Sequence, residues 1–243
     1  MSEAIQVTID GTAVTAAPGQ TILQAADAAG IYIPRLCAHP ELKPFGACRV
    51  CTVKVNGRPQ AACTTPATKG MVIENDTPEL LEHRRSLIEM LFVEGNHFCM
   101  FCERSGNCEL QALAYRFGID APRHAYQFPE RALDGSHPDV FIDRNRCVLC
   151  ARCVRASDEL DRKHVFDFVG RGRHKRIGVD AKERLADTPL AAGDRAVGAC
   201  PVGAILRKRT GYATPVGRRA FDFRPIGSDI EAARAAAPIA KGS

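Results

Sequence analysis

Residues 37–51 read CAHPELKPFGACRVC, and a further cysteine follows after eleven more residues. The spacing C-x10-C-x2-C-x11-C places four thiols on one short stretch of chain, and two prolines and Gly46 make its first interval a loop that can wrap a small inorganic centre. The candidate ligands are Cys37, Cys48, Cys51 and Cys63. Four thiolates are the usual ligands of a [2Fe-2S] cluster, so this stretch predicts one. Zinc remains an alternative, although zinc modules prefer close C-x2-4-C pairs.

The residues around this stretch predict a small α+β module. Thr21 can cap a helix over residues 21–29 that ends at Gly30. Asn56-Gly57 suits a type I′ hairpin turn, and a first turn is expected at Gly11-Thr12. Strands are expected at residues 5–10, 14–17, 51–55, 58–65 and 70–74. Two hairpins and one short helix indicate a β-grasp domain, which we assign to residues 1–76.

A second cysteine group lies in residues 97–108, which read HFCMFCERSGNC. Its thiols are Cys99, Cys102 and Cys108. Three thiols leave a [4Fe-4S] cluster one ligand short, and His97 is the nearest further donor. We therefore expect His97 to be the fourth ligand. The alternative is that His97 is hydrogen-bonded at a helix end and that an external group is the fourth ligand of the cluster.

Helices are expected on both sides of this second group. Thr77 and Pro78 have the residue types of an N-cap and a first helical position, and apolar residues at helical spacing follow them. A second helix, ELQALAYRF, begins directly after Cys108 and is expected to stop at Gly118. We assign residues 77–119 to this helical [4Fe-4S] segment and residues 120–137 to a connector.

The third group begins with CVLCARC at residues 147–153 and closes with a distant Cys-Pro pair. Its thiols are Cys147, Cys150, Cys153 and Cys200. This run resembles that of bacterial ferredoxins, but Ser157 occupies the place of their next cysteine, so one [4Fe-4S] cluster is indicated rather than two. A tight loop should lead into a helix near residues 156–160, and residues 171–176 should form a basic turn or hairpin. We assign residues 138–210 to a ferredoxin-like domain and residues 211–243 to a docking helix or a tail.

Composition narrows the functional class. Eleven cysteines without a secretory signal favour metal ligation over disulfides, and no apolar stretch approaches the length of a membrane span. A net charge of +5 with interspersed acidic residues does not require nucleic acid. No Rossmann fingerprint or P-loop is visible, so nucleotide binding is not expected. We expect a cytoplasmic chain that does not span a membrane.

The remaining histidines show no metal-like spacing with one another. They are His39, His83, His124, His137, His164 and His174. We expect them to be surface or hydrogen-bonding residues, with His39 close enough to Cys37 to influence the first cluster. The basic stretch RGRHKR is expected to be a solvated face.

The order of the three groups resembles the N-terminal iron–sulfur region shared by the large iron–sulfur subunit of respiratory complex I and the [FeFe] hydrogenases. The matching stretches are CAHPELKPFGACRVC with Cys63, HFCMFCERSGNCELQ, and CVLCARC with GACPVGAI. The chain is most similar to the small diaphorase (gamma) subunits of NAD-reducing [NiFe] hydrogenases. One position departs from much of the family, which has its histidine four residues before the first cysteine of the triplet, where this chain has Gly95.

The resemblance implies an electron-transfer subunit without an active site of its own. Single electrons would pass through one [2Fe-2S] and two [4Fe-4S] clusters between a flavin/NAD-binding diaphorase subunit and the small and large [NiFe] hydrogenase subunits. FMN, NAD and the [NiFe] centre would belong to those partners. A formate dehydrogenase or a complex I-like diaphorase could use nearly the same subunit. A zinc-binding interaction module is the alternative of another class.

Overall fold

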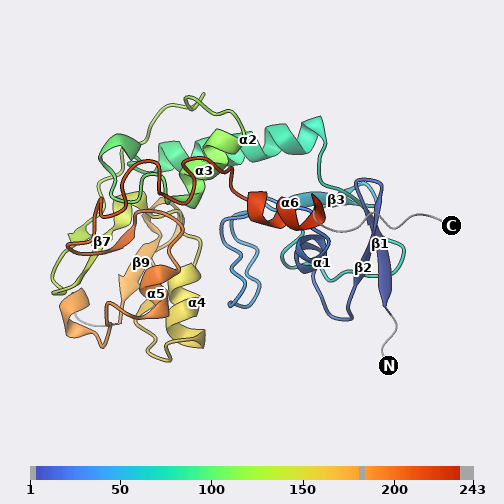
Figure 1. Cartoon of the computed structure of the whole chain (residues 1–243). Coiled ribbons are helices and arrows are strands. Elements are labelled where there is room, and N and C mark those ends of the chain that lie inside the picture. Colours follow the sequence, from blue (N-terminus) through green and yellow to red (C-terminus); the bar gives the residue numbers. More distant parts are fainter. Residues whose placement is uncertain (1–3, 181–183, 236–243) are drawn as a thin grey trace.

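The computed structural model describes residues 4–180 and 184–235. Its first module is a five-stranded mixed sheet in the order β2-β1-β5-β3-β4, in which only β1 and β5 run parallel. The strands are β1 Ile5–Ile9, β2 Thr12–Ala16, β3 Thr52–Val55, β4 Arg58–Ala61 and β5 Val72–Glu74. The sheet and the helix packed on it form the expected β-grasp arrangement (Figure 1).

Two tight turns set the register of this sheet. Asn56 and Gly57 both have positive φ, of 49° and 79°, as a type I′ turn requires. The first hairpin turns at Asp10 and Gly11 instead of Gly11-Thr12, because Asp10 also takes a positive φ of 46° and Thr12 already pairs with Ile9. The expected first turn was therefore displaced by one residue.

Helix α1 (Ile22–Ala28) packs its apolar face on the sheet. Thr21 and Gln24 form a capping box, in which the Thr21 hydroxyl accepts from Gln24 N and the Gln24 side chain accepts from Thr21 N. Gly30, with a φ of 69°, ends the helix in the left-handed conformation. The start and the end expected for this helix are both confirmed.

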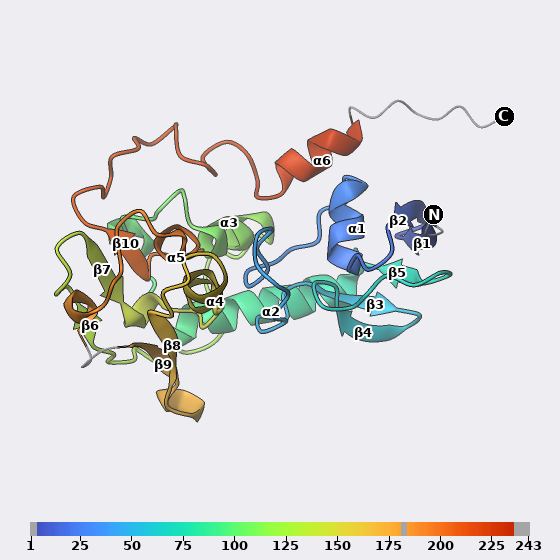
Figure 2. The same cartoon turned by 90° about the horizontal axis from the view of Figure 1, so that it is seen from below.

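Helix α2 (Pro78–Glu94) runs from the first module along the rest of the molecule (Figure 2). Thr77 caps it by accepting from Leu80 N, with Pro78 at the first helical position, as expected. After a 3-10 turn at Cys99–Phe101, helix α3 (Glu109–Arg116) packs against α2. Gly118 has a φ of 60° and follows the end of α3.

The third module is built on two small antiparallel sheets, one in the order β10-β7-β6 and one of β8 and β9. Its strands are β6 Leu133–Asp134, β7 Val140–Asp143, β8 Phe166–Val169, β9 Arg176–Val179 and β10 Ile205–Arg207. Its helices are α4 Arg152–Glu159 and α5 Arg195–Gly198, with 3-10 turns at Arg144–Arg146, Gly172–His174 and Leu185–Asp187.

Two expectations for this module need correction. Helix α4 starts at Arg152 rather than near residue 156, so Cys153 lies on the helix and not in the loop before it. The two residues of β6 fall in the stretch expected to be a plain connector, because their backbone pairs with Ile142 and Asp143 of β7. The basic stretch forms the turn between β8 and β9, as expected.

The C-terminal segment returns to the first module. Helix α6 (Ser228–Ala235) lies beside α1 (Figure 2). Arg116 of α3 donates to Ile226 O at 2.8 Å and pairs with Glu231 at 2.5 Å, while Arg234 donates to Thr12 Oγ1 at 3.0 Å. A helix is therefore present in this stretch, and its final residues lie outside the described residues. No helix in residues 4–180 or 184–235 combines the length and the apolar character needed to cross a bilayer.

Candidate metal centres

The first cysteine group lies on the loop that precedes β3, with Cys51 directly before that strand, and at Cys63 just after β4. Three of its thiols, Cys37, Cys51 and Cys63, are almost fully buried. The N–H of Cys37 donates to Cys48 Sγ at 3.4 Å, so the wrapping loop already points a backbone donor at a sulfur. The structure therefore brings all four predicted residues together.

The four thiols of this first site interact directly. Hydrogen bonds from the Cys48 and Cys63 thiols hold the pKa of Cys37 well below its usual range. A hydrogen bond from Cys63 lowers the pKa of Cys51 to about 7. Thiolate is the form of cysteine that ligates a metal, so part of this group is prepared for that role.

The second group surrounds a cavity between α2 and α3. His97, Cys99, Cys102 and Cys108 all line it, together with Arg146 and Gly203 of the third module. His97 Nε2 is buried and has no hydrogen-bond partner among the described residues. Burial lowers the pKa of His97 to about 4, helped by the nearby charge of Arg146, so the imidazole is neutral at pH 7. A neutral imidazole with an unpartnered nitrogen suits a metal-ligand role.

The absence of a side chain at Gly95 leaves room for the His97 ring. A Cβ at position 95 would lie 2.5 Å from His97 Nε2. The His97 ring thus occupies the space that a side chain from position 95 would enter. The backbone of Gly95, with a φ of −111°, is open to any residue, so the constraint at this position is one of space.

The third group is also well buried. Cys150, Cys153 and Cys200 are each at most 7% exposed, and all four thiols line one cavity. The remaining wall is mainly aliphatic, with Ile142 and Ile205 among its residues. Burial raises the pKa of Cys147 to about 11. It raises the pKa values of Cys150 and Cys153 further. These thiols lose their protons only when a cation stabilises the thiolates.

Within the described residues, no three His, Cys, Asp or Glu side chains come close enough together to hold one metal ion. The donors of the second and third groups surround cavities instead of converging on a point. Sulfur donors with one imidazole match the ligand chemistry of iron–sulfur clusters. The residues present therefore fit such clusters in both number and type.

Residues next to the cysteines of the third group contact both of the other groups. Arg146, next to Cys147, donates to Cys102 Sγ at 3.7 Å, and a Cβ at Gly203 would lie 2.7 Å from the same sulfur. On its other side, Arg155 of α4 donates to Cys37 O at 2.6 Å. The third group consequently lies between the first and the second, which is not the order of the sequence.

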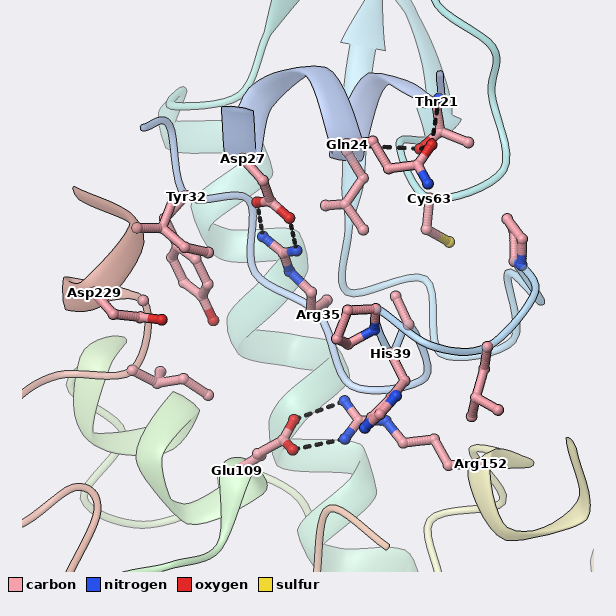
Figure 3. Close-up of a pocket in the computed structure, with 18 of the residues that line it drawn as sticks. Thr21, Gln24, Asp27, Tyr32, Arg35, His39, Cys63, Glu109, Arg152 and Asp229 are labelled. Carbon is pink, nitrogen blue, oxygen red and sulfur yellow. Dashed lines mark hydrogen bonds and ion pairs between the residues drawn. The ribbon is translucent and has the colours of Figure 1, made fainter. Parts of the chain in front are cut away.

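A cavity of about 690 Å³ separates the first module from α3, α4 and the C-terminal segment (Figure 3). Cys63 lies on its wall. Across it, Arg152 of α4 and Glu109 of α3 form a bidentate pair at 2.6 and 2.7 Å, and Arg35 pairs with Asp27 at 2.5 Å (Figure 3). The first of these pairs fixes the second and third modules to each other.

Comparison with known proteins assigns each region to an iron–sulfur family. Residues 2–78 match the 2Fe-2S iron-sulfur cluster binding domain, and residues 84–123 match the NADH-ubiquinone oxidoreductase-G iron-sulfur binding region. Residues 137–206 match the ferredoxin-like domain of NADH-quinone oxidoreductase subunit 3. The gamma subunit of the NAD-reducing hydrogenase HoxS of Cupriavidus necator is 42% identical over 91% of this chain and 95% of its own length.

The chain belongs to this gamma-subunit family. A crystal structure of an NAD+-reducing [NiFe]-hydrogenase in the H2-reduced state contains a chain that is 49% identical, with a TM-score of 0.89, covering 91% of this chain and 94% of that one. The mitochondrial NADH-ubiquinone oxidoreductase 78 kDa subunit of Candida albicans is 35% identical over 84% of this chain but only 28% of its own length. The expected membership and fold class are both confirmed. The chain is a subunit of an oxidoreductase complex.

The role of Arg84 on α2 was not predicted from the sequence. Arg84 is buried and donates to Thr52 O and Asn75 O at 2.9 and 2.8 Å. It ties α2 to the strand that follows Cys51. A charged residue at a core-facing helical position is the one signal that could have marked it.

Proposed function

We propose that the chain carries one [2Fe-2S] and two [4Fe-4S] clusters and relays electrons between them. The supporting observation is that eleven thiols and the unpartnered His97 nitrogen form three sets of four, each inside a region matched by an iron–sulfur family. The first set holds the [2Fe-2S] cluster. The second and third sets hold the [4Fe-4S] clusters, with His97 as the one nitrogen ligand. The division into residues 1–76, 77–119, 120–137, 138–210 and 211–243 stays a prediction.

When bound, each cluster supplies the chemistry of one-electron transfer. The chain supplies the order in which those steps occur. Because residues next to the third group's cysteines contact both the first and the second group, the proposed path runs from the first site through the third to the second, or in reverse. Apolar walls around the third site exclude water, while Arg146 and Gly203 bring its binding segment against Cys102.

The complex is proposed to be a cytoplasmic NAD-reducing hydrogenase that catalyses H2 + NAD+ = NADH + H+. A flavin/NAD-binding diaphorase subunit and the small and large [NiFe] subunits would hold FMN, NAD and the [NiFe] centre. The name of the 42% identical relative supports this assignment over a complex I-like diaphorase, whose matching 78 kDa subunit is 35% identical. A formate dehydrogenase using the same kind of subunit is the remaining alternative.

The test is to purify the chain anaerobically with its partners and to measure metals and EPR spectra. We expect on the order of ten iron atoms per chain, from four-ligand [2Fe-2S] and [4Fe-4S] sites, and almost no zinc. Reduced samples should show three separate cluster signals. Stoichiometric zinc with little iron would overturn the assignment, and co-purification with a formate-oxidising subunit would overturn the choice of complex.

A further inference from the structure

Arg155 leaves its own module and reaches into the first site. It projects from α4, is 8% exposed, and donates through Nη2 to Cys37 O at 2.6 Å and through Nη1 to Lys43 O. Its guanidinium also lies 5.3 Å from the centre of the Phe45 ring. All three contacts fall on the loop between Cys37 and Cys48, the loop that wraps the first site.

The same side chain starts beside the third site. Arg155 follows Cys153 by two residues on α4, and its charge interacts with both Cys37 and Cys150. One turn further along α4, Glu159 accepts from Lys43 N at 2.9 Å, which adds a second tie to the loop. The guanidinium therefore lies between two ligand sets that belong to different domains.

The charge of Arg155 is less balanced by carboxylates than that of Arg146 or Arg152. Arg146 pairs with Glu103 and Asp143, and Arg152 pairs with Glu109. In residues 4–180 and 184–235 Arg155 has no carboxylate within ion-pair distance, and the nearest acidic charge acting on it is the more remote one of Glu159. Its hydrogen bonds go to backbone carbonyls, which orient the fork without cancelling its charge.

We propose that Arg155 is a positioning residue shared by the first and third sites, which fixes the distance between their clusters and raises the reduction potential of both. The proposal rests on the cluster assignment given above. Each cluster gains one negative charge when it accepts one electron, and a buried cation nearby stabilises that reduced form. The two carbonyl contacts hold the wrapping loop against α4 and so set the spacing.

Redox titration of the purified complex, followed by EPR, tests the charge. In Arg155→Gln the midpoint potentials of the first and third clusters should both fall by at least about 59 mV, which is a tenfold change in a one-electron reduction equilibrium. The potential of the second cluster should not move. The matched control is Arg58→Gln, which removes the same charge from an exposed position of β4. Unmoved potentials in an Arg155→Gln complex that holds all its clusters would overturn the charge role.

Arg155→Lys tests the positioning, because lysine keeps the charge but cannot bridge both carbonyls as the fork does. We expect potentials near those of the wild type and a changed magnetic interaction between the reduced first and third clusters. An unchanged magnetic interaction in Arg155→Lys would overturn the positioning role. This test does not depend on whether Arg155→Gln binds its clusters. A wild-type complex that lacks the three cluster signals would instead refute the proposed function itself, before any variant is compared.

Discussion

The second and third sites have the same number of donors but differ in what covers them. Around the third site, three thiols are at most 7% exposed, and the walls are mainly aliphatic, with Arg144 as a charged member. At the second site, Cys99 and Cys102 are only partly buried, and the neighbouring Phe98, Met100 and Phe101 are 60%, 83% and 71% exposed. The third site is thus enclosed and lies between the other two. The second site lies at the surface, where an electron can enter or leave the chain.

The largest expected effect comes from removing the cluster of the third site. Cys200→Ala deletes one of the four thiols of the third site, so its cluster should be lost and the path between the outer sites interrupted. We expect H2-dependent NAD reduction by the complex to be abolished. NADH-dependent reduction of an artificial acceptor at the flavin should persist, which serves as the internal control for assembly. Normal H2-dependent turnover in this variant would contradict the proposed path.

The second site should respond to changes at its nitrogen donor. His97→Cys replaces a neutral imidazole by a thiolate, so the cluster should remain while its midpoint potential falls, because negative charge disfavours reduction. His97→Ala should leave one iron open and lower the iron content. An EPR-monitored titration measures both. His124, whose side chain is half exposed, provides the control His124→Ala. Three unmoved signals in His97→Cys would show that His97 is not a ligand.

The features that depend on short spacings along the chain could be predicted from the sequence. The closely spaced thiols, the Asn56-Gly57 turn and the Thr21 cap each depend on residues within a few positions of one another, whereas Cys63 and Cys200 lie 12 and 47 positions after the preceding cysteine of their groups. The start of α4 was placed too late, since no side chain caps it and Ala151 enters it from the left-handed conformation, with a φ of 59°. A helix without a capping residue gives little start signal.

The spatial order of the sites could not be read from the sequence. It depends on contacts such as those of Arg146 with Cys102 and of Arg155 with Cys37, which join residues 44 and 118 positions apart. Neither periodicity nor spacing reports on such pairs. The two residues of β6 were missed for a similar reason, because a strand of that length carries no alternation.

The junction between the two sites should depend on the Glu109–Arg152 pair. Arg152 is 3% exposed, and Glu109→Gln would leave its charge without a counterion. Removing one member of a buried pair costs about 3 kcal/mol. We expect a lower free energy of unfolding in chemical denaturation of the loaded chain. The exposed pair of Arg209 and Asp139 offers the control Asp139→Asn, which should cost less than about 1 kcal/mol. Equal effects of both variants would contradict the buried role of Glu109.

The smallest expected effect concerns the close approach of the two sites at Gly203. An alanine Cβ there would lie 2.7 Å from Cys102 Sγ and 3.3 Å from Arg104 Cβ, so the second site must shift to make room. Such overpacking costs about 2 kcal/mol, which lowers the Tm of a chain of this size by about 4–8 °C. The matched control is Gly193→Ala, because a Cβ at Gly193 meets nothing within 4 Å and its Tm should be unchanged.

EPR separates this local effect from a general loss of stability. In Gly203→Ala the signal of the second cluster should change shape, because the substitution displaces a sulfur of that site. The signal of the first cluster should stay as it is in the wild type, since neither Cys102 nor Arg104 lines its ligand set. If Gly203→Ala and Gly193→Ala behave alike in both Tm and EPR, the segments that bind the second and third clusters do not meet at Gly203.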